Sequence, residues 1–398
     1  MPGESHTLTR PGAAAFLVMF TLDATARALL ITVLPLQAYA LLKDAQLVSV
    51  LYFGASGLGL CASLSVPWLV QIVGRQGAVI VGSLCLAIAA ALFSLQELWA
   101  LPAGLVLQMF GGAAITICLN LYVLEIVPTS TFTRFEPNRM LLAGIGWMTG
   151  PLLGITLAER VTPWLPFALS GSISLLLLAY LLLIGAPRNP SSRKSASMGT
   201  NPLRFVRRYF AQPRLTLAWL LSVGRSAWWN MFFIYAPIYA VETGLGKEAG
   251  GLITSVGSAG LFTVTFWGWM GRRNGIRWLL ILGYVATAIT SAFAGLTMAW
   301  PLVGAAFLIA SAFAASITDG PGNVPFLRAV HPHERAGMTS IYSTYREAGR
   351  LAVPAVYSVV LLVLPLSAVF IASGATMLVL AHFSRYLPRR FGRDRHTG

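Results

Sequence analysis

Seven ionisable side chains interrupt stretches of sequence that are otherwise apolar. They are the acids Asp23, Asp319 and Glu347 and the arginines Arg27, Arg225, Arg346 and Arg350. A charge near the centre of a bilayer costs about 3 kcal/mol on insertion scales, so such residues face a protein interior or an aqueous cavity. Guanidinium groups stay protonated and bind carboxylate, phosphate or sulfonate groups, whereas a buried carboxylate can have its pKa moved toward physiological pH. The excess of positive charge favours an anionic ligand, with which a proton could compete.

Helical spacing predicts pairs among these groups. Asp23 and Arg27 are four residues apart, so they share a helix face and can pair. Arg346 and Arg350 also share a face and repel each other unless an anion, either Glu347 or a ligand, lies between them. The alternative is that Asp23–Arg27 and Glu347–Arg350 are purely structural ion pairs. For Asp319 the alternative is a helix end, because the sequence DGPGN is typical of a helix terminus.

Aromatic and amide side chains accompany the charges. Tyr345 precedes Arg346, and Trp229 and Asn230 follow Arg225 by about one helical turn. Together with Gln37 they could line a pocket for an amphiphilic ligand. The alternative for the aromatic rings is a position facing lipid or at the membrane interface.

The composition is that of a membrane protein. The chain has 398 residues, of which 56% are hydrophobic and 10% are charged, against about 25% charged in soluble domains. A membrane span needs about 20 predominantly apolar residues. We predict twelve spans, over 13–42, 47–72, 78–96, 100–127, 140–160, 163–185, 215–241, 249–270, 278–297, 300–328, 338–364 and 366–387. The expected fold is an all-α membrane protein.

The positive charge lies mostly on one side of the predicted membrane. With the N-terminus in the cytoplasm, 21 of the 28 Lys and Arg residues fall in cytoplasmic segments. This bias predicts that both termini are cytoplasmic. The net charge of +15 is therefore explained by loops between spans, and we expect no nucleic-acid partner.

The longest polar connection divides the spans six and six. We predict an N-terminal six-helix bundle over 1–185, a basic cytoplasmic linker over 186–214 and a C-terminal six-helix bundle over 215–398. The halves look like repeats, since counting back twelve residues from Pro35 and Pro237 gives Asp23 and Arg225. Internal repeats of this kind place a binding site near the membrane midplane.

Three motifs resemble the major facilitator superfamily. PWLVQIVGRQG (Pro67–Gly77) is similar to its loop after span two, with Gly74 and Arg75 matching and Gln71 at the usual aspartate. GWMTGPLLG is similar to a signature of the fifth span found mostly in proton-coupled antiporters of drugs and organic compounds; its key residues are Gly146, Gly150, Pro151 and Gly154. Small residues at this spacing allow close helix approach, and pure packing is the alternative reading. HPHERAG (His331–Gly337) is similar to the loop before span eleven.

The resemblance implies two pseudo-symmetric six-helix bundles and alternating access. Spans one, four, seven and ten would line the cavity, and span eleven would lie at the interface between halves, so its charges either bind substrate or gate the halves. The expected substrate-binding residues are Arg27, Arg225, Arg346, Arg350, Tyr345, Trp229, Asn230 and Gln37. The expected proton-coupling residues are Asp23, Glu347 and Asp319. The expected conformational residues are Gln71, Gly74, Arg75, Gly146, Gly150, Pro151 and Gly154.

The predicted function is proton-coupled efflux of an amphiphilic or anionic organic molecule, such as a drug-like compound or a carboxylate siderophore. The alternative is uptake of an organic anion by proton symport, and a rival from another class is a non-transporting scaffold or receptor. No catalytic motif such as HExxH, a Walker loop or a nucleophile elbow occurs in the sequence. We therefore expect no enzyme activity, cofactor or metal. The expected partners are the substrate, protons and membrane lipids, for a monomer in a bacterial inner membrane.

Overall fold

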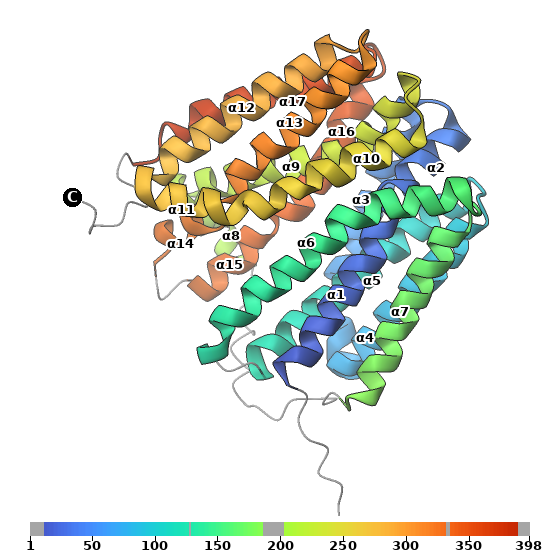
Figure 1. Cartoon of the computed structure of the whole chain (residues 1–398). Coiled ribbons are helices and arrows are strands. Elements are labelled where there is room, and N and C mark those ends of the chain that lie inside the picture. Colours follow the sequence, from blue (N-terminus) through green and yellow to red (C-terminus); the bar gives the residue numbers. More distant parts are fainter. Residues whose placement is uncertain (1–11, 127–128, 186–202, 332–334, 389–398) are drawn as a thin grey trace, which may run out of the picture. The chain divides into compact units, whose positions relative to one another are not determined.

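The computed structural model describes residues 12–126, 129–185, 203–331 and 335–388, and every regular element in these ranges is helical (Figure 1). The helices form two compact units. Unit 1 takes in Met1–Val33 and Ala55–Ser191, and unit 2 takes in Leu34–Gly54 and Ser192–Gly398. Residues 186–202 of the predicted linker and 332–334 of the predicted loop before span eleven lie outside the described residues.

Unit 1 is built around its first helix. Its helices are α1 (Ala13–Leu30), α4 (Val66–Ser94), α5 (Ala100–Ile126), α6 (Thr129–Arg160) and α7 (Leu165–Leu183), with the end of α3 (Ala45–Leu64). Helix α1 packs against α5, α6 and α7, and α4 packs against α5 and α7. In the core, Phe16 of α1 stacks on Tyr122 of α5 with ring centroids 5.6 Å apart.

The fifth-span motif forms the contact between α6 and α1. A Cβ atom at Gly150 would lie 2.7 Å from the carbonyl carbon of Ala28, and one at Gly154 would overlap the carbonyl oxygen of Leu29. Glycine at these two positions therefore lets the helix backbones approach closely. The motif packs directly against the helix that carries Asp23 and Arg27.

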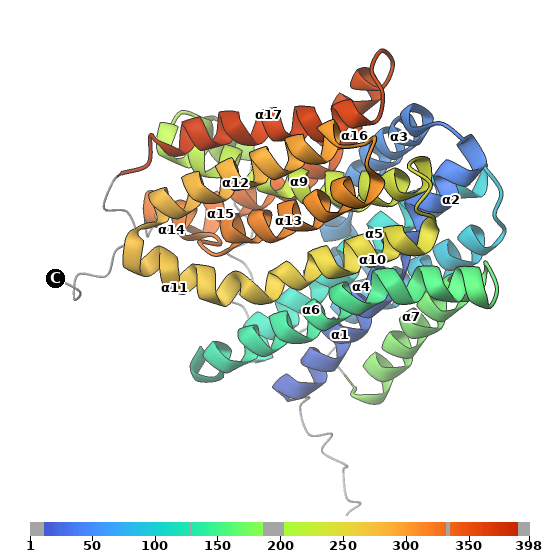
Figure 2. The same cartoon turned by 45° about the horizontal axis from the view of Figure 1, so that its top comes forward.

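Unit 2 is built around α9 (Figure 2). Its other elements are α2 (Val33–Leu42), the first half of α3, α8 (Leu203–Phe210), α9 (Pro213–Glu242), α10 (Lys247–Ala259), η2 (Gly260–Thr263), α11 (Val264–Asn274), α12 (Ile276–Leu296), α13 (Pro301–Asp319), α14 (Val324–Ala329), α15 (Arg335–Ser343), α16 (Tyr345–Val360) and α17 (Ser367–Ser384). Helix α9 packs against α10, α13, α16 and α17, and α12 lies beside α13 and α17.

The segment Leu34–Gly54 is held within unit 2 by hydrogen bonds. The Tyr39 hydroxyl donates to Glu242 over 3.1 Å, and the hydroxyls of Ser49 and Tyr235 lie 2.7 Å apart. Both partners belong to α9. Unit 2 therefore includes the helical hairpin that follows α1 in the sequence.

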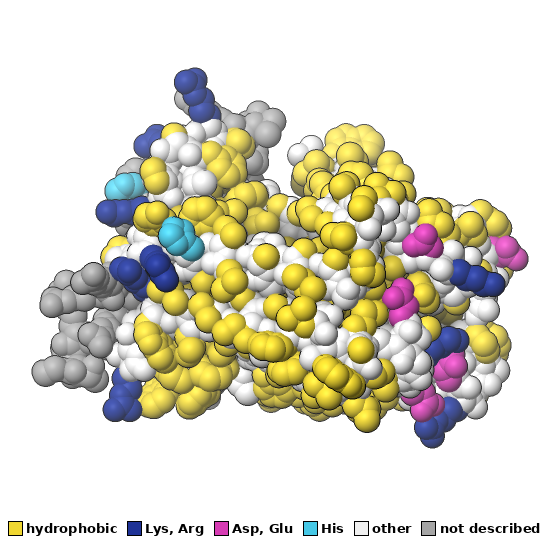
Figure 3. Space-filling model, turned by 90° about the horizontal axis from the view of Figure 1, so that it is seen from above, with side chains coloured by type: hydrophobic (Ala, Val, Ile, Leu, Met, Phe, Trp, Pro, Cys, Tyr) yellow, Lys and Arg dark blue, Asp and Glu magenta, His cyan; other side chains and the backbone are white. Residues whose placement is uncertain are grey.

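Ten helical stretches in the described residues are long and apolar enough to cross a membrane. The predicted spans 215–241 and 338–364 are not among them. The first corresponds to α9, and the second is divided at Thr344 into α15 and α16. Figure 3 shows hydrophobic side chains over most of the face in view and charged side chains mainly toward its left and right ends, as expected for helices surrounded by lipid.

Prolines and glycines account for other departures from the predicted spans. The first span turns at residues 31–32, because Pro35 has no N–H to bond the carbonyl of Ile31. The expected loop after span two is absorbed into α4, whose break lies at Gly74 with φ of 74°. Helix α4 itself begins at Val66, and Pro67 is tolerated in its first turn.

We predict that Gly150→Ala and Gly154→Ala each destabilise the protein by about 1–3 kcal/mol, because the added methyl overpacks a backbone contact. Gly146→Ala is the matched control in the same helix. Its Cβ would meet only ordinary contacts with Thr25, the nearest at 3.4 Å. Thermal unfolding of the purified protein in detergent checks this prediction, and equal midpoints for all three variants would contradict the packing assignment.

Candidate functional site

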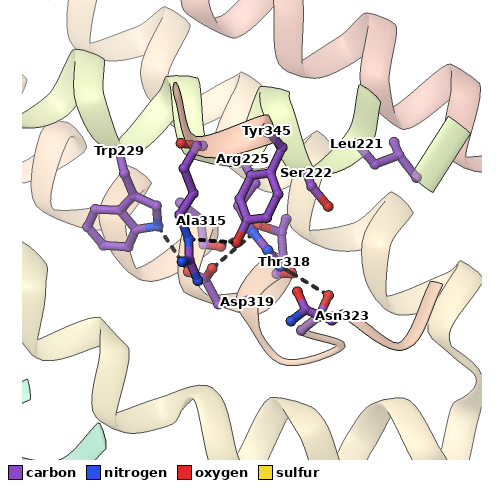
Figure 4. A network of polar contacts seen from close by, with 12 residues as sticks. Leu221, Ser222, Arg225, Trp229, Ala315, Thr318, Asp319, Asn323 and Tyr345 are labelled. Carbon is purple, nitrogen blue, oxygen red and sulfur yellow. Dashed lines mark hydrogen bonds and ion pairs between the residues drawn. The ribbon is translucent and has the colours of Figure 1, made fainter. Parts of the chain in front are cut away.

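Arg225 is the centre of a polar network inside unit 2 (Figure 4). Its Nε lies 3.3 Å from Oδ1 of Asp319, and its Nη1 donates to the main-chain carbonyl of Thr318 over 3.2 Å. The same Nη1 lies 3.4 Å from the carbonyl oxygen of Gly322. The side chains of Arg225 and Asp319 are 11% and 21% exposed, so this ion pair is largely desolvated.

Two aromatic side chains complete the network. The Trp229 indole donates to Oδ2 of Asp319 over 2.9 Å, so each oxygen of this carboxylate has a partner. The Arg225 guanidinium lies 5.8 Å from the centre of the Tyr345 ring, within range of a cation–π contact. The structure thus brings together four of the predicted site residues, from α9, α13 and α16.

The network is possible because α13 ends at Asp319. Gly322, with φ of 52°, turns the chain before α14 begins. The carbonyl groups at a helix end have no partner within the helix, and Arg225 donates to one of them, that of Thr318, and to the carbonyl of Gly322 in the turn that follows. Tyr342 of α15 donates to Asn323 in the same turn over 3.2 Å. The helix-end reading of Asp319 therefore agrees with the structure.

The charges of α16 are more accessible. Glu347 and Arg350 pair at 3.2 Å with side chains 35% and 39% exposed, and such a pair contributes little to stability. Arg346 is exposed, and its Nε donates to the Tyr345 hydroxyl over 3.2 Å. Arg346 and Arg350 therefore keep donor capacity for an anion.

Unit 1 contains the predicted Asp23–Arg27 pair, formed within α1. Asp23 is 2% exposed and the Arg27 side chain 32%. Among the described residues, Oδ1 of Asp23 and Nε of Arg27 are buried without a hydrogen-bond partner. Gly112 of α5 faces Arg27, since a Cβ there would lie 3.7 Å from its Cδ and Nη1.

The remaining predicted residues lie elsewhere. The Asn230 amide donates to the Ser226 carbonyl of its own helix over 2.7 Å. Gln37 is half-buried in α2, two residues from Tyr39, which bonds Glu242. Glu242 follows Arg225 by 17 positions in α9, which separates these two residues by roughly 25 Å along the helix.

The predicted conformational residues after span two lie in α4. Gln71 is exposed, Arg75 is half-buried, and Gly74 is buried in the left-handed region that favours glycine. Gly275 was missed by the sequence analysis. It has φ of 100° and follows Gly268 by seven residues, as Gly74 follows Pro67. The same seven-residue spacing in both halves of the sequence could have pointed to Gly275.

Gly349 was also missed. A Cβ there would meet Oγ of Ser226 at 2.8 Å, so α16 approaches α9 through a glycine, as α6 approaches α1. Gly349 lies five residues before Pro354. This spacing of a glycine and a proline in the sequence could have pointed to Gly349.

Comparison with known proteins identifies the family. The chain matches the Major Facilitator Superfamily over residues 16–354 and belongs to it. It is therefore an integral membrane transporter, and its role is transport rather than catalysis. A search of curated proteins found no significant match.

Solved structures with the same fold are distant in sequence. The nucleoside transporter NupG is similar with a TM-score of 0.73 and 16% identity, over 94% of this chain and 98% of that one. A D-xylose–proton symporter has a TM-score of 0.73 and 14% identity, over 96% and 97%. A POT family transporter in complex with a thioalcohol-conjugated peptide has a TM-score of 0.73 and 14% identity, over 93% and 94%. These likenesses establish the fold alone.

We predict that Arg225→Ala destabilises the protein by about 3 kcal/mol, because Asp319 is left largely buried without its cation. Combining Arg225→Ala with Asp319→Asn should recover part of this loss, since the unpaired charge is removed. Arg346→Ala, at an exposed arginine, is the control. Thermal unfolding in detergent measures all three, and an Arg225→Ala midpoint as high as that of Arg346→Ala would refute the pairing.

Proposed function

We propose that this protein is a proton-coupled secondary transporter that exports an amphiphilic or anionic organic molecule by alternating access. The observation that carries the proposal is the Asp23–Arg27 pair. Asp23 is buried, yet one of its oxygens has no partner among the described residues. A carboxylate in such a place changes its protonation when a neighbouring charge or its hydration changes. The half-exposed Arg27 beside it could bind an anionic substrate in competition with the proton.

The substrate class follows from Arg346 and Arg350. Both arginines belong to α16. Arg346 is exposed, and Arg350 is half-exposed and pairs with the half-exposed Glu347. Two guanidinium groups on one helix face suit a carboxylate, phosphate or sulfonate group. The aromatic ring of Tyr345 lies beside Arg346, and this combination of an apolar ring and a charge suits an amphiphilic substrate. A drug-like acid and a carboxylate siderophore both have this chemistry.

The coupling role is assigned mainly to Asp23. Asp319 bonds Arg225 and Trp229 with both of its oxygens, so its charge stabilises unit 2 in every step that leaves these contacts intact. Glu347 is half-exposed and paired with Arg350. It would respond to the substrate as well as to protons.

The proposed setting is a monomer in a bacterial inner membrane, with both termini cytoplasmic. Ten candidate spans, α9 and the pair α15 and α16 would make the twelve spans of two six-helix halves. Uptake by proton symport is the second candidate, because a similar structure is that of a D-xylose–proton symporter. The same charged residues would serve either direction.

The test is flux in proteoliposomes with an imposed pH gradient, across a panel of amphiphilic carboxylates, phosphates and sulfonates. We expect at least one compound to move opposite to the proton flow. Movement with the protons would support symport, and no flux for the whole panel would favour a scaffold or receptor. In the same assay Asp23→Asn should abolish the dependence on the pH gradient, because the titrating carboxyl group is lost. Asp319→Asn is the control, and dependence that persists in Asp23→Asn would refute the assignment.

A second prediction concerns the arginines of α16. Arg346→Ala and Arg350→Ala should each lower the flux about tenfold or more, since a hydrogen bond to a charged group contributes about 1.5–3 kcal/mol. The thermal midpoint should stay near that of the wild type, because both side chains are partly or fully exposed. Arg273→Ala, at an exposed arginine near the end of α11, is the matched control. Wild-type flux in both α16 variants would overturn their role.

A further inference from the structure

Helix α8 is amphipathic and already has a partner for its apolar side. Tyr209 is fully buried, and its hydroxyl donates to the carbonyl of Leu215 at the start of α9 over 3.1 Å. Phe210 meets the Trp219 ring edge-on with centroids 5.4 Å apart. The helix is thus fastened to the protein by its aromatic side chains, and its orientation in unit 2 is fixed.

The basic side of α8 points away from these contacts. Arg207 and Arg208 are exposed, and Arg214, in the first turn of α9, is exposed as well. Tyr209 and Leu215 belong to an apolar cluster that also contains Phe326 of α14, and the exposed Arg328 lies in that helix two residues further on. Four exposed arginines therefore lie within two residues of members of one apolar cluster.

Two features of the same region suit a membrane surface rather than a soluble anion. The sequence has no acidic residue over 203–221 or 324–331, so the ionised side chains of these two segments are all positive. Phe210 and Leu327 are large hydrophobic residues 42% and 43% exposed beside them. Exposed apolar side chains together with guanidinium groups fit the boundary between headgroups and acyl chains. A freely dissolved anion would use only the charges.

We propose that Arg207, Arg208 and Arg214, with Arg328, form a binding surface for the headgroups of anionic phospholipids. Guanidinium groups bind the lipid phosphate, and Phe210 and Leu327 contact the upper part of the acyl chains. Helix α8 connects this surface to the interior of unit 2, because the apolar cluster that contains Tyr209 also contains Tyr342 and Tyr345. Bound lipid should therefore stabilise the region around Arg225.

The test uses the purified full-length chain in non-ionic detergent with added phosphatidylglycerol or phosphatidylcholine. Native mass spectrometry gives the lipid affinity and thermal unfolding gives the stabilisation. Arg207→Gln/Arg214→Gln is compared with Arg272→Gln/Arg273→Gln, which removes the same charge from two exposed arginines of α11. The first variant should lose about fivefold in phosphatidylglycerol affinity for each arginine. The second should keep the wild-type affinity.

Two further measurements test whether the arginines recognise a lipid or only a soluble phosphate. Arg207→Lys/Arg214→Lys keeps the charge and should retain most of the phosphatidylglycerol effect. Glycerol phosphate, which has the headgroup anion without acyl chains, should give no stabilisation. Equal losses in the two glutamine variants, or stabilisation by glycerol phosphate as large as that by the lipid, would overturn the proposal.

Discussion

An ionised side chain among apolar helices needs a partner, and each unit meets this requirement in a different way. In unit 2, Arg225 pairs with Asp319 and donates to the carbonyl of Thr318 in the last turn of α13 and to that of Gly322 in the following turn. The ion pair therefore holds α9, α13 and the following turn together. In unit 1, Asp23 and Arg27 pair within a single helix, so this ion pair does not connect α1 to another helix. Within the part of the chain that the structure describes, one polar atom of each side chain has no hydrogen-bond partner.

This difference explains why we assign different roles to the carboxylates of Asp319 and Asp23. A carboxylate with both oxygens bonded, such as Asp319, is held in place by its partners. We propose that Asp23, one oxygen of which has no partner among the described residues, changes its protonation while the fold stays intact. The glycines at 150 and 154 bring α6 directly against the helix that carries Asp23.

The sequence predicted what depends on local pattern. Apolar length predicted the helical membrane fold, and spacing within one helix predicted the Asp23–Arg27 and Glu347–Arg350 pairs. The partner of Arg225 was not predictable, because Asp319 is distant in sequence and reaches it only where α13 ends beside α9. The breaks at residues 31–32 and at Thr344 were missed, because the apolar length of a span does not show where a helix is interrupted. Gly74 was found from a motif, whereas Gly275 needed a comparison of the two halves.

The central claim is that Asp23 exchanges the coupling proton while Asp319 does not. Infrared difference spectroscopy of the purified protein in lipid, recorded as the pH is changed, detects protonated carboxyl groups without any knowledge of the substrate. The account predicts a titrating carboxyl band that is lost in Asp23→Asn and kept in Asp319→Asn. A band that survives in Asp23→Asn and disappears in Asp319→Asn would contradict it.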